Sequence, residues 1–353
     1  MLCIIRLKRV ESGFALTWLL IGIGPAFVSL PAASFSHTLA AQPVVYMLTA
    51  YGVIGVAFLI GKLIERGKDR AIERISPLLI LSIALSVILV AIGGWLTIRD
   101  YFGVWAHDEF VRFQYHGPTR DIAKWLDQHP EITDVAIGTH PNELVLDPLA
   151  LRLDLTREDV NARWFNAESS LVLSGMHPVV LSAMQSPGEE VQSILSTRGW
   201  LENKQATFEV YSTMPLFGAL YPPGGAFDHG RLVFLGGGAQ PLAHQARPGQ
   251  LMKWGVTWRI QESLSSLRLK LFLHVLNDKG EVIAGDDRED VNFATLKAGD
   301  NFWQFGQLIL PNNVPPGQYQ VEIGWYNPET GERLKRDDGS DRFLLDPIEV
   351  IAP

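Results

Sequence analysis

The stretch that decides the fold is "GGWLTIRDYFGVWAHDEF", residues 93–110, where a long apolar run gives way to a mixed sequence. The apolar run ends at Arg99 and Asp100. Four aromatic residues typical of a membrane interface surround this pair: Trp95, Tyr101, Phe102 and Trp105. We therefore interpret the stretch as the point where a helix leaves a bilayer and an external region begins.

The amino-acid totals narrow the classes of protein. The chain has 353 residues, enough for two or three domains. Its formal net charge of -8 argues against a nucleic-acid partner, because such proteins usually carry a basic face. The single cysteine, Cys3, excludes an intrachain disulfide and a cysteine-based zinc site.

Three apolar stretches reach or approach the length of about 20 residues that a membrane helix needs. They cover about residues 14–30, 43–64 and 77–98, and none contains an acidic residue. Lys and Arg residues precede the first stretch and fill the loop at 62–76, whereas the loop between the first two stretches carries no formal charge. The positive-inside rule then predicts a cytoplasmic N-terminus and an extracytoplasmic location for everything after about residue 98.

These patterns predict an integral protein of the bacterial cytoplasmic membrane, with residues 1–106 as its transmembrane region and the lipid bilayer as a partner. A rival interpretation treats residues 1–30 as a signal peptide, with Arg6, Lys8 and Arg9 as its basic region. That interpretation would place the basic residues of the 62–76 loop outside, against the positive-inside trend.

The remaining sequence predicts two external modules joined by a linker. Residues 107–214 combine two helical patterns, near 117–132 and 187–200, with short apolar strands, which indicates a small α/β domain. Residues 215–227 contain Pro-Pro-Gly-Gly and are typical of a linker. Residues 228–353 carry about seven alternating strands with turns, which indicates an antiparallel β-sandwich. The expected fold class is therefore an α-helical transmembrane segment of three spans, followed by a small α/β domain and an antiparallel β-sandwich.

The order of these features resembles the C-terminal part of bacterial membrane glycosyltransferases of the GT-C type. These are related to the dolichyl-phosphate-mannose protein mannosyltransferases and the aminoarabinose transferases. Their last spans run into a segment of the form D-Y-F-x-x-W-A, and residues 100–106, "DYFGVWA", match it completely. The segments at 271–287, 315–334 and 348–350 resemble phrases of the sandwich domain found in some of these proteins.

The resemblance implies transfer of a hexosyl or pentosyl group from a polyprenyl-phosphate-linked sugar to an extracytoplasmic acceptor. It places the family's carboxylate base and metal-associated acidic residues in external loops, and it allows a divalent metal in the complete family members. Here the loop at 31–42 contains no Asp or Glu. We therefore expect the C-terminal part of such an enzyme, with the catalytic loop missing and no activity of its own. The alternative is a non-catalytic, membrane-anchored protein that binds carbohydrate or an envelope partner.

A few residues are candidates for contact with the donor or the lipid phosphate. His37 and Asp100 are candidates for a catalytic role, and Arg99 and His37 for binding a donor or lipid phosphate. The alternatives are a solvated loop histidine for His37 and an interfacial anchor for Arg99 and Asp100. Asp147, His140 and His177 are scattered along the sequence, and we interpret them as structural or solvated.

No cofactor is identifiable in this chain, and we assign no metal site. The acidic segments at 285–292 and 336–341 have the oxygen-rich composition of calcium loops but lack the spacing of an EF-hand, so acidic turns are the preferred interpretation. Six aromatic residues fall inside strand patterns and are expected in the core: Trp254, Trp258, Trp303, Tyr319, Trp325 and Tyr326. Because neighbours along a strand face opposite ways, we expect one of the adjacent Trp325 and Tyr326 to be exposed.

Overall fold

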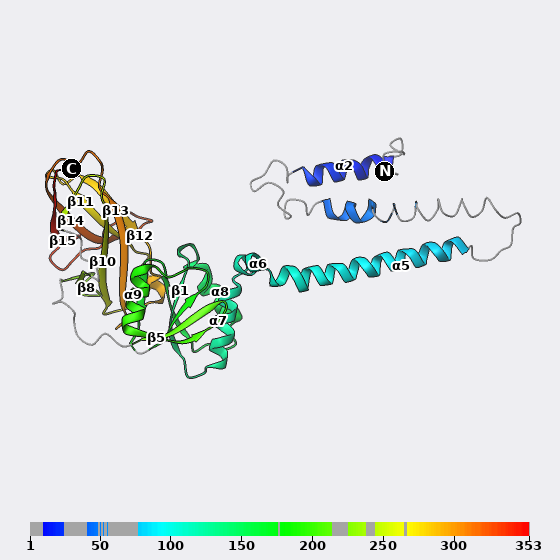
Figure 1. The fold of residues 1–353 in the computed structure, drawn as a ribbon, viewed down its shortest axis with the longest axis horizontal. Helices are drawn as coiled ribbons and strands as arrows, with labels where there is room; N and C mark the ends of the chain where they lie inside the picture. Colours follow the sequence, from blue (N-terminus) through cyan, green and yellow to red (C-terminus); the bar gives the residue numbers. More distant parts are fainter. Residues whose placement is uncertain are drawn as a thin grey trace, which may run out of the picture. The chain divides into compact units, whose positions relative to one another are not determined.

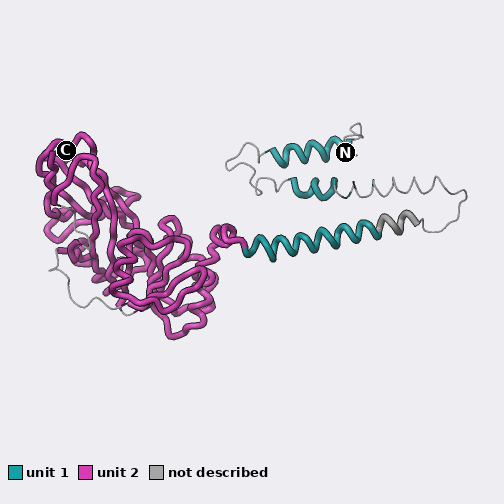
Figure 2. The backbone as a smooth tube through the Cα atoms, viewed as in Figure 1, with its two compact units in different colours: residues 1–107 teal, residues 108–353 magenta. Residues whose placement is uncertain are grey.

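A computed structural model describes residues 10–24, 41–48, 50, 52, 55, 77–175, 177–213, 225–237, 244–264 and 267–352. The chain divides into two compact units, residues 1–107 and 108–353 (Figure 2). The division falls between His107 and Asp108, within the stretch at 93–110. Each unit is described separately below.

The first unit contributes helices. Helix α2 spans Val10–Ile23, with 14 residues, and helix α5 spans Pro77–Ile98, with 22 residues. Helix α5 continues into a π-helical segment, η2 (Arg99–Val104), and a 3-10 turn, η3 (Trp105–His107). Within the described residues, Ala84–His107 is the one helical stretch that is long and apolar enough to cross a membrane.

The expectation of three membrane spans is therefore corrected. At a rise of 1.5 Å per residue, the 14 residues of α2 reach about 21 Å, short of the roughly 30 Å of a hydrocarbon core. Helix α2 ends at Ile23, before Gly24 and a proline in the sequence, whereas the apolar run counted toward the first span continues to residue 30. Most of the second expected span, 43–64, lies outside the described residues.

The second unit begins with three helices and a five-stranded sheet (Figure 1). Its helices are α6 (Glu109–Gln114), α7 (Gly117–Gln128), α8 (Leu146–Asp154) and, further along, α9 (Glu189–Arg198), with a 3-10 turn η4 (Pro141–Glu143) before α8. The first sheet has the order β2-β1-β4-β6-β5. Its strands are β1 (Asp134–Thr139), β2 (Asn161–Asn166), β4 (Val179–Ser182), β5 (Gly199–Lys204) and β6 (Phe208–Thr213). Strands β2, β1 and β4 are parallel, and β6 and β5 are antiparallel.

The two faces of this first sheet are covered by different partners. Val135, Ile137 and Val180 belong to the core cluster that includes α7 and α8. Their neighbours along the same strands, Ala136 and Val179, belong to the cluster that includes α9 and the rest of the unit. Because side chains alternate along a strand, α7 and α8 lie on one face of the sheet and α9 on the other.

The remaining strands form two facing sheets. One has the order β3-β13-β10-β8-β7 and the other β12-β11-β14-β15-β9. The first of these contains β3 (Ser170–Leu173), β7 (Gly225–Phe227), β8 (Leu232–Gly237), β10 (Leu251–Ile260) and β13 (Asn301–Ile309). The other contains β9 (Gln245–Ala246), β11 (Lys270–Leu276), β12 (Val282–Arg288), β14 (Gly317–Tyr326) and β15 (Phe343–Val350), and a 3-10 turn η5 (Phe293–Thr295) follows β12.

Aromatic side chains pack between these two sheets. The Trp258 and Trp325 rings lie 5.3 Å apart, and the Phe234 and Phe343 rings lie 5.0 Å apart. Trp325 is fully buried, while Tyr326 is half-buried and directs its hydroxyl to Asp287, so the two neighbours point to opposite faces as expected but neither is fully exposed.

The expected fold class is wrong in a second respect, because the chain after the helical stretch Ala84–His107 is mostly β-sheet, with three sheets. Strand β3, which the sequence places in an α/β domain, pairs antiparallel with β13. One continuous core joins α9, both facing sheets and the face of the first sheet that carries Ala136 and Val179. Local patterns identify strands but not their partners, and this core makes residues 108–353 a single compact unit.

Asp290 holds the crossing from β2 to β3. Its side chain is 3% exposed and accepts hydrogen bonds from Asn166 Nδ2 at 2.9 Å, Ser169 Oγ at 2.7 Å and Arg288 Nε at 2.9 Å. Its backbone oxygen accepts two more, from the Asn166 amide and the Ser170 hydroxyl. A segment 120 residues away in the sequence is thereby fixed to the turn that leads from one sheet to the next.

Replacing Asp290 by alanine should lower the free energy of unfolding by about 3 kcal/mol, because three donors, one of them charged, would lose a buried acceptor. The measurement is urea unfolding of the full chain in detergent. Asp337→Ala, at an exposed turn position, is the matched control and should change stability by less than about 0.5 kcal/mol. Equal effects of the two substitutions would contradict the role assigned to Asp290.

Candidate functional site

The stretch at 93–110 brings the predicted interfacial residues together on one exposed helix surface. Arg99 Nη2 lies 2.6 Å from Asp100 Oδ1, and the Arg99 guanidinium lies 5.5 Å from the centre of the Trp95 ring. The Tyr101 ring stacks on Trp105 at 4.8 Å and meets Phe102 edge-on at 5.0 Å. All of these side chains are exposed.

This arrangement suits an anchor better than a catalytic site. The Arg99 and Asp100 side chains are more than half exposed and pair with each other, so neither is held in a desolvated position. A general base needs a positioned partner within hydrogen-bond reach of its substrate. The assignment of Asp100 to catalysis and of Arg99 to phosphate binding stays a prediction. His37 lies outside the described residues.

A second cluster lies at the start of the second unit. His116, which follows α6, has a left-handed backbone (φ 52°), and its Nδ1 lies 2.7 Å from Asp147 Oδ1. Asp147, in the first turn of α8, is fully buried and also accepts from Thr119 Oγ1 at 2.8 Å and from Thr139 Oγ1. Glu143 Oε2 lies 3.9 Å from His116 Nδ1.

This cluster has the donor set of a metal site. One atom each of His116, Glu143 and Asp147 lies within 4.8 Å of the others, and a histidine nitrogen with two carboxylates suits several divalent cations. However, both oxygens of Asp147 already accept hydrogen bonds from protein donors. These hydrogen bonds form a structural link that ties the end of α6, the start of α7 and strand β1 to α8, while Glu143 Oε2 is buried without a hydrogen-bond partner among the described residues.

Removing one donor of this link tests its structural role. Thr139→Val should lower the free energy of unfolding by about 1–3 kcal/mol, because one buried oxygen of Asp147 loses its partner. Thr156→Val is the control, because Thr156 is exposed and its hydrogen bond to Asp127 comes from the backbone amide. The measurement is urea unfolding of the full chain, repeated with Zn²⁺ and with EDTA. A free energy of unfolding that rises with Zn²⁺ in the wild type would contradict the structural interpretation.

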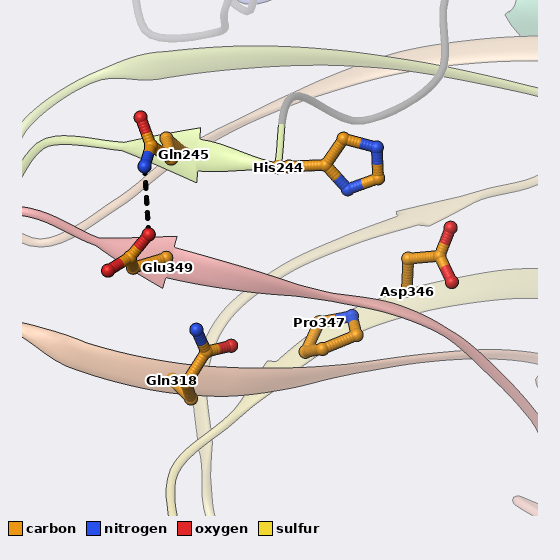
Figure 3. Close-up of a pocket in the computed structure, with 6 residues that line it drawn as sticks. All are labelled: His244, Gln245, Gln318, Asp346, Pro347 and Glu349. Carbon is orange, nitrogen blue, oxygen red and sulfur yellow. Dashed lines mark hydrogen bonds between the residues drawn. The ribbon is translucent and has the colours of Figure 1, made fainter.

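A third candidate is a polar pocket at one edge of the facing sheets (Figure 3). It encloses about 830 Å³ and is lined by His244, Gln245, Gln318, Asp346, Pro347 and Glu349. Gln318, Glu349 and Gln245 are direct partners across β14, β15 and β9. Direct partners share a face of the sheet, so these side chains form an amide–carboxylate–amide row.

The row is partly preorganised. Gln245 Nε2 donates to Glu349 Oε2 at 2.8 Å, which holds one side of the row in place. Each amide offers both a donor and an acceptor, whereas the carboxylate offers acceptors. The row can therefore exchange several hydrogen bonds with a ligand that carries neighbouring hydroxyl groups.

The acidic segments considered for calcium serve the protein's own donors. Asp286 accepts from Trp254 Nε1 at 3.0 Å and from the Gln307 amide at 2.9 Å. Asp287 accepts from the Tyr326 hydroxyl, and Asp338 accepts from Ser340. These contacts support the interpretation of both segments as structural turns and strand ends.

His274 links three strands on the outer face of the third sheet. Its Nδ1 lies 3.2 Å from Glu322 Oε1 and its Nε2 lies 3.0 Å from Asp287 Oδ1. Burial alone would lower the pKa of His274, but the hydrogen bonds and charges of Asp287 and Glu322 outweigh it and raise the pKa. Glu322 also pairs with Arg333 and Arg342, and contacts with Arg342 and His274 hold the pKa of Glu322 below its usual value despite burial.

This network predicts a pH dependence of stability. Because the folded state raises the pKa of His274, its contribution is complete below the unfolded value of about 6.5 and is lost as the pH rises through the folded value. The stability advantage of the wild type over His274→Gln should therefore shrink between about pH 6 and pH 9. Unfolding at several pH values measures it, with His229→Asn at an exposed turn as the control. An advantage that grows with pH would contradict the assignment.

The sequence interpretation missed most of these groups. His116 and Asp147 are 31 residues apart, so their pairing leaves no local pattern, and Glu143 falls in a turn between them. Gln245, Gln318 and Glu349 come from three strands whose order depends on pairing over more than 100 residues. Their common feature, a polar side chain next to strand residues, is too frequent to identify a site.

Comparisons with known proteins give no close match. No family model and no curated protein matches the sequence. Among solved structures, the C-terminal domain of wzt matches over 31% of this chain and 63% of its own, with 16% identity and a TM-score of 0.22. A β-glucosidase from Listeria innocua in complex with isofagomine matches over 40% of this chain and 18% of its own, with 14% identity and a TM-score of 0.23.

A β-glucuronidase from glycoside hydrolase family 2 also matches, over 41% of this chain and 13% of its own, with 9% identity and a TM-score of 0.25. The chain thus spans less than two thirds of each of these structures. TM-scores of this size assign neither a family nor a function. The geometry of the chain itself therefore carries the function proposed below.

Proposed function

We propose that this chain is a non-catalytic, membrane-anchored protein whose unit at 108–353 binds a carbohydrate of the cell envelope. The observation that carries the proposal is the row of Gln245, Glu349 and Gln318, which presents amide and carboxylate groups side by side in an open polar pocket. Sugars offer neighbouring hydroxyls that both donate and accept, and this row can satisfy both roles.

The anchor rests on the helical stretch Ala84–His107, whose side chains are not buried in the structure. The stretch has 24 residues and reaches about 36 Å, enough for the roughly 30 Å of a hydrocarbon core. Five Lys and Arg residues in the sequence at 62–76 precede this helix. By the positive-inside rule they favour a cytoplasmic side before the helix and an extracytoplasmic side for residues 108–353.

A second candidate is the C-terminal part of a GT-C type glycosyltransferase. The sequence "DYFGVWA" at 100–106 favours it, and in that case the same pocket would hold the acceptor rather than a free glycan. A polyprenyl-phosphate-linked sugar would then be the donor, bound by parts of the enzyme other than this unit. Turnover of such a donor by this chain alone would refute the non-catalytic proposal.

Binding to an array of bacterial envelope oligosaccharides tests the proposed function. The full chain in detergent should bind at least one glycan class, and Gln318→Ala should weaken that binding about fivefold to tenfold, as expected for the loss of one or two hydrogen bonds. Gln307→Ala is the matched control, because Gln307 is exposed on β13 and donates to Asp286 through its backbone amide. Absence of glycan binding, or equal weakening by both variants, would overturn the proposal.

A further inference from the structure

Exposed apolar side chains gather at the start of the second unit. Helix α6 exposes Phe110 and Phe113, and helix α8 exposes Leu146, Leu149 and Leu153. We refer to these five residues as the α6–α8 surface. Elsewhere among the described residues of this unit, exposed large apolar side chains occur singly or in pairs along strands.

Helix α8 has a row of apolar side chains on the face that is exposed to water. Its inward residues, Asp147 and Leu151, are buried, and they are four positions apart on one face. Leu146, Leu149 and Leu153 follow the i, i+3, i+7 spacing of another face, and Leu153 is 86% exposed. A helix that buries one face in a soluble protein normally presents polar residues on the opposite face. The stripe therefore indicates a second apolar environment.

Helices α6 and α8 are linked through the turn between α6 and α7. His116, two residues after α6 ends, bonds to Asp147 in the first turn of α8. The chain between α6 and α7 is also tight, because a Cβ at Gly117 would lie 2.9 Å from the Arg112 carbonyl oxygen. Helix α7 packs directly against α8 (Figure 1). The α6–α8 surface is consequently a fixed part of the unit.

The chain itself limits how far this surface can be from a membrane. Phe110 is the third residue after His107, where the apolar helical stretch ends. Three residues span at most about 11 Å, so Phe110 must lie within that distance of the end of the stretch. Trp105, the last of the aromatic residues assigned to the membrane interface, precedes His107 by two residues, so the end of the stretch lies close to the headgroup layer.

The composition of the surface suits the same layer. Phenylalanine and leucine on one face are typical of short helices that lie in the plane of the interface. Arg152 is exposed beside Leu153 in the last turn of α8, where a cation can reach lipid phosphates while the leucines face the acyl chains. Tyr115 extends the exposed aromatic side chains beyond α6.

We propose that the α6–α8 surface rests in the headgroup layer of the phospholipid bilayer, with Leu149 and Leu153 reaching the upper acyl chains. This inference rests on the membrane anchor of the proposed function. It adds a second contact between the protein and the membrane, which sets the face that the unit at 108–353 presents to the lipid.

Quenching by lipid-borne probes in vesicles tests the proposal. Full chains with Cys3→Ser carry one cysteine labelled with an environment-sensitive fluorophore, at Leu149→Cys or Leu153→Cys. The vesicles contain phosphatidylethanolamine and phosphatidylglycerol, with or without a lipid that carries a nitroxide near the top of its acyl chain. Val282→Cys and Leu344→Cys, exposed apolar positions on the third sheet, are the matched controls, and Val90→Cys in α5 reports the anchor.

We expect the nitroxide to quench labels at Leu149 and Leu153 at least about threefold more than labels at the controls, as for helices buried by several Å in the interface. Quenching at Val90 without quenching at Leu149 and Leu153 would overturn this inference and leave the anchor intact. No quenching at Val90 would refute the anchor and the inference together. A blue-shifted label at Leu149 that ignores the nitroxide and depends on protein density would assign the surface to a second copy, and would also overturn the inference.

Discussion

The crossing from β2 to β3 is the constraint on which the second unit depends. The chain leaves one sheet at Asn166 and enters another at Ser170, and Asp290 receives hydrogen bonds from both sides of this step. Because β3 then pairs with β13, the crossing commits two sheets to a single core. A carboxylate buried in this way is costly unless each of its oxygens has a donor, and here the side chain has three.

Asp147 uses the same chemistry where strand β1 meets helix α8. It joins β1, the helices α6 and α7, and α8 through two threonines and a histidine. One carboxylate thus fixes the sheet to the strands that follow, and the other fixes it to the helices that precede it.

The sequence predicted local elements better than their assembly. Proline at the start and the apolar spacing of Ile122, Ala123 and Trp125 identify α7, and a strand was expected close to β1. Helix α8 was missed, because its nine residues place leucines outward and two carboxylates inside its bounds. The sequence predicted too many membrane spans, because hydropathy alone does not show that α2 ends at Ile23. The pocket depends on pairing between distant strands, and no local pattern encodes which edge strands will meet.

The strand order of the third sheet separates the polar pocket from the crossing between β2 and β3 that Asp290 holds. Strand β12, which leads to Asp290, forms one edge, and β9, which carries Gln245, forms the other. Four strand spacings of about 4.8 Å make a width of roughly 19 Å. A ligand held at the β9 edge would therefore lie across the full width of this sheet from β12 and from Asp290.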